Sequence, residues 1–268
     1  MRSVQGRLPK GLRAGVAAGS RWTLLAGLAF MLAACAGSGQ YQWGWYLLDP
    51  RMERGAQNLR FLLTGAGATL QLSLTAILIS IALGLAVALI GLARPRLARM
   101  AGRAYVEGFR AIPMLVLLLW VYYGLPVALG VQLGVFWAGV LTLALSDSAF
   151  EAEVFRAGIQ AVPRGQLEAA QTLGFSSLQR IRYIILPQAV RTVLPALGNQ
   201  FIYVLKMSSL ISVIGFQELT RRANELNVTE YRPLEIYSFL VIEYLILILL
   251  VSWLVRWVER RGSGARAR

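Results

Sequence analysis

The stretch FRAGIQAVPRGQLEAAQTLGFSSLQRIRYIILP, residues 155–187, is a polar segment between two long apolar runs. Proline and glycine interrupt helices, so Pro163 and Gly165 predict the end of one helix. Residues 166–173 then predict a short helix that ends at Gly174, because glycine is the preferred residue just past a helix C-terminus.

A further short helix is predicted within the same segment. Ser176 and, three residues later, Gln179 match a capping box, which marks a helix N-terminus. Pro187 predicts the entry into the next apolar run. The segment is therefore predicted to form a helical hairpin that protrudes from a membrane, and an ordinary amphipathic helix at the membrane surface is the simpler alternative.

The composition of the whole chain is that of a membrane protein. Hydrophobic residues make up 57% of the 268 residues and charged residues 15%, against about 25% in a typical soluble domain. A helix needs roughly 20 apolar residues to cross a bilayer. We therefore predict an all-α, polytopic integral membrane protein. The runs that carry at most one charge are 61–93, 111–146, 192–217 and 236–255.

The net charge of +14 arises from arginine clusters at the edges of the apolar runs. This placement follows the enrichment of Lys and Arg on the cytoplasmic side of membranes, and no stripe of base-stacking aromatic residues accompanies it. We therefore predict contact with membrane lipids and no nucleic-acid binding. The chain has no histidine and one cysteine, Cys35, so the sequence predicts no metal site, no cofactor and no histidine-based catalysis.

The run 111–146 is too long for one crossing, and Gly124, Pro126 and Gly130 supply a break. With a cytoplasmic N-terminus, every arginine-rich short segment falls on the cytoplasmic side. Both termini and the 155–187 hairpin are thus predicted to lie in the cytoplasm, with the chain in the cytoplasmic (inner) membrane of a bacterium. The six predicted spans are 22–38, 64–92, 105–126, 133–154, 188–214 and 236–257.

The first apolar segment allows a second interpretation. Residues 22–36 follow a basic stretch, as in a secretory signal. Leu32 to Cys35 also resembles the site at which bacterial lipoproteins are cleaved and lipidated. Because alanine and leucine dominate this region, a retained membrane span is the preferred interpretation.

The residue spacing in the hairpin resembles the signature of permeases of ATP-binding-cassette (ABC) importers. That signature is Glu-Ala-Ala, then Gly, then Ile and Leu-Pro at fixed intervals. The segments 156–160, 164–166 and 186–189 are similar to the polar amino acid branch of this class, which includes histidine, glutamine and glutamate permeases. The resemblance covers about residues 60–260 and implies a type I importer permease fold, with a five-helix core plus an N-terminal span. The matching residues are Glu168, Ala169, Ala170, Gly174, Ile184, Leu186 and Pro187.

The resemblance implies partners and a division of the chain. The partners are cytoplasmic ABC ATPase subunits, a second permease subunit of the same or a related sequence, and an external amino-acid-binding protein. The chain has no Gly-x-x-x-x-Gly-Lys-Ser/Thr loop, so it is predicted to be the pore subunit and not an enzyme. The implied division is 1–58 with the first span and an external loop, 59–260 as the transmembrane domain, and 261–268 as a basic tail. The implied ATPase-coupling residues are Gly165, Gln166, Glu168, Ala169, Ala170 and Gly174.

Departures from the branch bear on the transported solute. The segment Arg110-Ala111-Ile112-Pro113 is closer to glutamate/aspartate permeases, which favours an acidic or amide amino acid. Lys206-Met207-Ser208-Ser209 stands where the branch often has Lys-Asp-Thr-Ser, so a role carried over to this position is open. An ion-coupled secondary amino acid transporter is the alternative function, but it would leave the hairpin without a partner. The candidates for a substrate path or gate are Lys206, Glu243, Arg110, Ser208 and Ser209.

Charges inside a bilayer are costly and face protein or water. Lys206 and Glu243 fall at similar depth on antiparallel spans, which predicts an ion pair, either structural or in contact with the solute. The alternative is that both face water. A cytoplasmic latch is also predicted between neighbouring spans, with snorkelling to the headgroups as the alternative for Arg110. The latch residues are Glu107 and Arg110 on one span and Asp147, Glu151 and Glu153 on the next.

Small residues in the second span predict close helix packing. They form the pairs Gly84 with Ala88 and Gly67 with Ala68. Asp147 and Glu151 are four residues apart and so share one face of their helix.

Overall fold

The computed structural model describes residues 41–93 and 95–263, with side chains up to 260. Residues 41–43 belong to a separate unit, so the fold below is that of residue 44 onward. The described part contains helices and no β-strand, which confirms the all-α prediction. The predicted first span, 22–38, and residues 264–268 lie outside the described residues.

Within the described residues, four helices are long and apolar enough to cross a membrane, and a bent pair makes up to five. The bent pair is α3 (Arg96–Ala111) and the segment Met114–Leu129, which meet at 101°. The four helices are α2 (Glu53–Leu92), α6 (Val135–Gln160), the stretch Ser177–Ile214 and α11 (Pro233–Ser263).

The predicted span over 105–126 is not a single straight helix. The segment Met114–Leu129 consists of α4 (Met114–Leu119), a π-helical turn η2 (Trp120–Gly124) and α5 (Leu125–Leu129). Ile112 is extended, with φ −85° and ψ 124°, because the ring of the following proline disfavours a helical conformation there. The break therefore comes at Ile112-Pro113, ahead of the predicted break.

An α-helix begins at Leu186, in agreement with the predicted entry at Pro187, but no break separates it from the hairpin helix before it. The second hairpin helix continues into the next span through α8 (Ser177–Arg180), a π-helical turn η3 (Ile181–Ile185), α9 (Leu186–Met207) and the 3-10 turn η4 (Ser208–Ile214). A widened π turn directly before the proline accommodates a residue that lacks a backbone N–H. The hairpin and the span therefore share one helical rod.

Other helices begin earlier than predicted. Glu53 starts α2, so part of the predicted external loop 39–63 is helical, and a 3-10 turn, η1 (Trp45–Leu48), precedes it. An acidic residue in the first turn favours this start through the helix dipole. The predicted loop 215–235 contains α10 (Leu219–Glu230).

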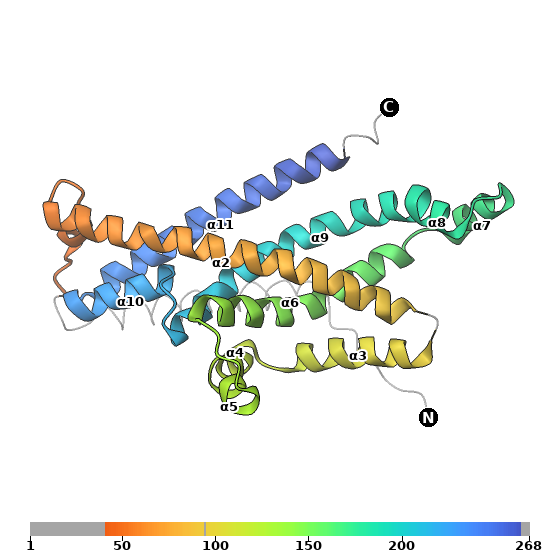
Figure 1. Ribbon diagram of the computed structural model, residues 1–268. Coiled ribbons are helices and arrows are strands. Elements are labelled where there is room, and N and C mark those ends of the chain that lie inside the picture. Colours follow the sequence, from red (N-terminus) through yellow and green to blue (C-terminus); the bar gives the residue numbers. More distant parts are fainter. Residues whose placement is uncertain (1–40, 94, 264–268) are drawn as a thin grey trace, which may run out of the picture. The chain divides into compact units, whose positions relative to one another are not determined.

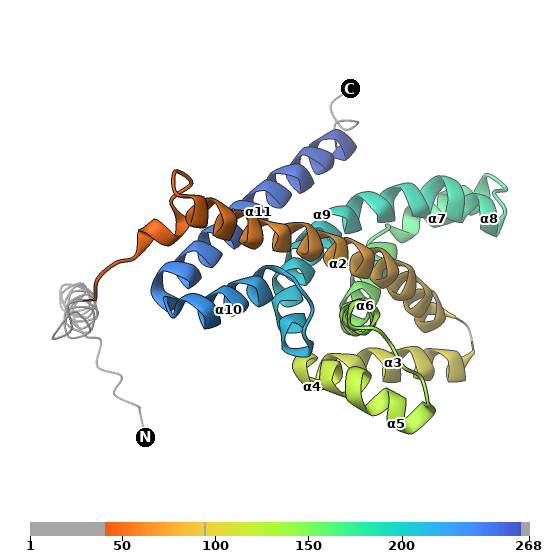
Figure 2. The ribbon, with the colours of Figure 1, turned by 60° about the vertical axis from the view of Figure 1, so that its left-hand side comes forward.

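The core lies where α2, α6 and α9 pack together (Figures 1 and 2). Gly84 of α2 allows a close approach to α6, because a Cβ atom there would lie 2.8 Å from Glu151 Cβ and 3.0 Å from the carbonyl oxygen of Ser148. Gly67, by contrast, has nothing within 4 Å of such an atom. The predicted close packing thus holds at Gly84 and fails at Gly67. The buried core includes Leu72, Ala76, Leu143, Val204 and Ile211.

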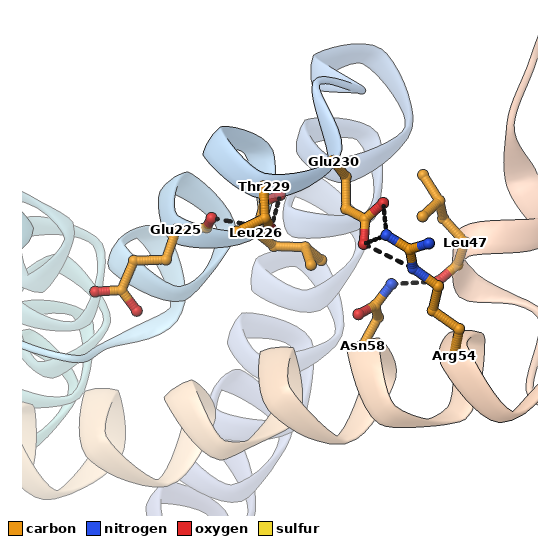
Figure 3. Close-up of polar contacts among 7 residues, drawn as sticks. All are labelled: Leu47, Arg54, Asn58, Glu225, Leu226, Thr229 and Glu230. Atoms are coloured by element: carbon orange, nitrogen blue, oxygen red, sulfur yellow. Dashed lines mark hydrogen bonds and ion pairs between the residues drawn. The ribbon is translucent and has the colours of Figure 1, made fainter.

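The start of α2 and the end of α10 are tied together by polar contacts (Figure 3). Arg54 donates to both carboxylate oxygens of Glu230, at 2.9 Å each from Nη2. Asn58 Nδ2 donates to the carbonyl oxygen of Leu47 at 3.1 Å, which fixes η1 against α2. Because Glu230 is largely buried while Arg54 is exposed, the bidentate pair is only partly screened by solvent.

Glu218 caps the N-terminus of α10 and is fully buried. Its Oε1 accepts from the Arg221 backbone N–H at 2.8 Å, and its Oε2 accepts from the Tyr244 hydroxyl at 2.8 Å. Burial raises the pKa of the Glu218 carboxyl, and the hydrogen bonds that it accepts oppose this shift only in part.

Glu218→Ala is expected to lower the free energy of unfolding by about 2 kcal/mol, because α10 loses its cap and the Tyr244 hydroxyl loses its carboxylate acceptor while keeping Thr220 close by. Glu218→Gln retains an acceptor and should cost less. Because the folded-state pKa of Glu218 is raised, its contribution to stability falls as pH rises through the window between the unfolded and folded pKa values, and Glu218→Gln lacks this contribution. Thermal unfolding in detergent measures both effects, and equal losses in the two variants would contradict the capping role.

Candidate functional site

The predicted hairpin is present, and its first helix is α7 (Arg164–Thr172). The preceding helix α6 runs to Gln160, so the connection begins at residue 161 and not at 155. Gly174 has φ 78°, a left-handed conformation that suits glycine. Its N–H donates to Gln171 O and the Phe175 N–H donates to Ala170 O, both at 3.0 Å, which together make a Schellman motif.

The second hairpin helix begins as predicted. Ser176 Oγ accepts from the Gln179 backbone N–H at 3.3 Å, and Gln179 Oε1 accepts from the Ser176 N–H at 2.8 Å. This is a complete capping box. The tip between α7 and α8 is therefore held at both ends by local hydrogen bonds.

Most of the predicted coupling residues lie on the exposed side of α7. Ala170 is the exception, since it is only 2% exposed. Gly165 and Gly174 have no atoms within 4 Å of a built Cβ, so the backbone angle and not crowding demands glycine at 174. The exposed members are Gly165, Gln166, Glu168, Ala169 and Gly174.

Polar contacts tie α7 to the rod that follows it. Gln188 Nε2 of α9 donates to Gln166 Oε1 at 2.6 Å. Arg180 of α8 donates to Gln171 Oε1 at 3.2 Å. A force applied to α7 can therefore pass into α8 and α9.

The hairpin also exposes apolar side chains, which sequence reasoning missed. Leu173 is 75% exposed and Leu178 is 73% exposed, and they stand on either side of Gly174. The available signal was leucine within a polar segment. Exposed leucines beside a carboxylate make a surface suited to another protein.

The predicted ion pair between Lys206 and Glu243 is wrong. Lys206 is exposed, whereas Glu243 is 8% exposed and neither of its carboxyl oxygens has a hydrogen-bond partner. Equal depth along two helices places side chains at one level, but it does not place them on facing sides. The other two candidates on this segment bond within it: Ser208 donates to Leu205 O at 2.8 Å, and Ser209 donates to Lys206 O at 2.9 Å.

The predicted latch does not form as ion pairs within the described residues. Arg110 lies over the ring of Phe150, 5.1 Å from its centroid. Glu153 pairs with Arg156 on its own helix. Asp147 and Glu151 do not pair with an arginine of either helix. Both are fully buried, and their hydrogen-bond partners come from α2 and α9.

Four polar side chains meet instead at the centre of the helix packing. Ser80 Oγ of α2 lies 2.9 Å from Asp147 Oδ2 and 3.0 Å from Glu151 Oε2, and Gln200 Nε2 of α9 donates to Asp147 Oδ1. The shared face of Asp147 and Glu151 is confirmed. Ser80 and Gln200 were missed, and the only signal for them is a polar residue within an apolar helix.

The sequence of the chain matches a known family of membrane transport components and two permeases of known class. The model of the family described as binding-protein-dependent transport system inner membrane component matches residues 79–263. The chain is 39% identical over 204 residues to a probable glutamine ABC transporter permease of Bacillus subtilis (strain 168), covering 76% of this chain and 94% of the relative. It is 34% identical over 201 residues to an arginine transport system permease of the same organism, covering 75% and 92%.

A solved structure agrees with these relatives. The chain is similar to a protein in the crystal structure of an amino acid ABC transporter with histidines, with a TM-score of 0.72 and 40% identity. The match covers 77% of this chain and 96% of that one. A chain of the MetNI methionine ABC transporter matches with a TM-score of 0.66 at 22% identity, which supports the fold alone.

Proposed function

The chain belongs to the family of binding-protein-dependent transport system inner membrane components, as a permease of the ABC importer class with the type I fold, and we propose that it carries a polar amino acid across the membrane. The observation that carries the solute class is the 39% identity to a probable glutamine permease over 94% of its length. Glutamine is the first solute to test, since an amide or acidic amino acid is also what the residues around Arg110 favour.

The α7–α8 hairpin is proposed as the point at which a cytoplasmic ATPase subunit grips the chain. Glu168 supplies an exposed charge, Ala169 lets a partner approach the backbone, and Leu173 and Leu178 supply apolar area. Because Ser177–Ile214 is one helical rod, a displacement of the hairpin moves α9 within the core. The hydrolysis of ATP is the work of the partner, and the proposed orientation puts the hairpin and both termini in the cytoplasm.

A second permease subunit and an external amino-acid-binding protein complete the proposed transporter. The ion-coupled alternative is not retained, because the named relatives are ABC permeases. Lys206, Arg110, Glu243, Ser208 and Ser209 stay candidates for the solute path, although Ser208 and Ser209 use their hydroxyl groups within their own segment.

The function is tested in proteoliposomes that contain this chain with its ATPase. Radiolabelled glutamine is expected to accumulate when ATP and the external binding protein are supplied, and not when either is left out. Arginine, histidine and glutamate are run as competing solutes. Accumulation by the chain alone, driven by an ion gradient, would refute the proposal.

A further inference from the structure

The central cluster of Ser80, Asp147, Glu151 and Gln200 is not explained by the hairpin mechanism. Ser80, Asp147 and Glu151 are 0% exposed, and the cluster joins α2, α6 and α9. Its carboxyl groups lie on successive turns of α6 and share the hydroxyl group of Ser80.

The cluster has too few hydrogen-bond donors to satisfy two ionised carboxylates. A hydroxyl group has one hydrogen to donate, so Ser80 can donate to Asp147 or to Glu151 but not to both. Two buried carboxylates at one site repel each other, and such pairs hold a proton between them. A proton on Glu151 Oε2 satisfies both contacts of Ser80, because Glu151 then donates a hydrogen bond to Ser80 and Ser80 donates one to Asp147.

The other oxygen of Glu151 supplies a separate observation. Glu151 Oε1 is buried and has no hydrogen-bond partner. Burying an ionised oxygen without a hydrogen-bond donor is costly. The carbonyl oxygen of a neutral carboxylic acid carries less charge and therefore loses less solvation free energy on burial. Asp147 receives donors on both oxygens, from Ser80 and Gln200. The bound proton therefore belongs on Glu151 and the negative charge on Asp147.

No cation among the described side chains forms an ion pair with Asp147 or Glu151. The helix α2 carries no charged residue after Arg60. On α6 itself, Glu153 and Arg156 pair with each other. Other helices packed against α6 also carry titratable or charged groups, of which Tyr105 bonds Ser148. These groups are Arg191, Tyr203 and Lys206 of α9, Tyr122 and Tyr123 of η2, and Arg96, Arg99, Arg103, Tyr105, Glu107 and Arg110 of α3.

We propose that Ser80, Asp147, Glu151 and Gln200 form a buried site that holds one proton, and that the carboxyl group carrying this proton is linked to the position of α9. The proposal rests on the proposed function, because the hairpin is what moves α9. When α9 withdraws Gln200, Asp147 loses one of its donors and becomes the better base. The proton of Glu151 then passes to Ser80 Oγ while the hydroxyl hydrogen of Ser80 passes to Asp147 Oδ2, with no change in net charge.

The direct test is infrared spectroscopy of the full chain, purified with its ATPase in lipid nanodiscs. The C=O stretch of a protonated carboxyl group differs from that of a carboxylate. Glu151→Gln is expected to lose a carboxylic-acid component that Glu153→Gln, two residues along the same helix, retains. Glu243 can contribute a similar band, so the difference between the two variants is what decides. An unchanged band in Glu151→Gln overturns the proposal.

A second arm measures thermal stability against pH in the same preparations. Beyond its midpoint, the protonated fraction of a single site falls about tenfold per pH unit. Wild type and Glu153→Gln are expected to lose more stability on the alkaline side than Glu151→Gln, in which the loss that comes from Glu218 remains. The same alkaline loss in Glu151→Gln, or a dependence on Na⁺ at constant pH in its place, overturns the proposal. Neither arm requires a transported solute, so an error in the proposed function would appear in the uptake assay alone.

Discussion

Uptake is expected to fall about 30-fold in Glu168→Lys, because a coupling free energy of about 2 kcal/mol between ATPase and permease is lost. Glu168 lies exposed on α7. The substitution reverses the charge offered to the partner but leaves the core untouched, so membrane insertion and the purified yield should stay normal. Solute uptake and ATPase activity are measured together in proteoliposomes.

Gly174→Asp is expected to give the same loss through the backbone. A non-glycine residue in the left-handed conformation costs about 1 kcal/mol, and the added carboxylate meets the negative end of the α7 dipole. The Schellman bonds at 3.0 Å would loosen, and the tip would no longer hold its shape.

Thr172→Ala is the matched control for both variants. Thr172 is exposed on the same helix, and its hydroxyl donates only to the Glu168 carbonyl oxygen, at 3.1 Å. Its uptake should equal that of wild type. Normal uptake by Glu168→Lys and Gly174→Asp would remove the coupling role from the hairpin, whereas loss in all three would indicate a folding defect.

The hairpin could be predicted well because its signals are local. A glycine after a short helix and the Ser176–Gln179 capping box act over three or four residues, and the structure shows both. The apolar runs likewise identified the long helices, since length and hydropathy suffice for that.

The bend at Pro113 and the continuity through Pro187 could not be judged in the same way. Both residues are prolines in apolar surroundings, yet the chain turns by 101° at one and passes through a π turn at the other. Which outcome occurs depends on the packing of neighbouring helices, which can support a widened turn. The residues next to each proline do not reveal how the neighbouring helices pack around it.

The contacts inside the membrane were the least predictable part of the candidate site. Depth along a helix can be counted from the sequence, but rotation about the helix axis relative to a neighbour cannot. Lys206 and Glu243 were therefore paired wrongly. The same uncertainty hid Ser80 and Gln200, which become visible only when three helices are assembled.

Gly84→Leu is expected to destabilise the chain by about 3 kcal/mol, near the upper end of the usual cost of overpacking. A Cβ at Gly84 would meet Glu151 Cβ at 2.8 Å and the Ser148 carbonyl oxygen at 3.0 Å. A backbone oxygen cannot move aside as a flexible side chain can, so α2 and α6 must separate. The measurement is the fraction of chain that stays monodisperse after heating in detergent.

Gly67→Leu provides the control on the same helix. Nothing lies within 4 Å of a Cβ at Gly67, so this variant gains the same helix propensity and apolarity without a clash. It should be as stable as wild type or slightly more so. If both variants lost stability equally, the cause would lie in insertion or in partners of α2, and the α2–α6 packing that holds Ser80 against Asp147 and Glu151 would not depend on Gly84.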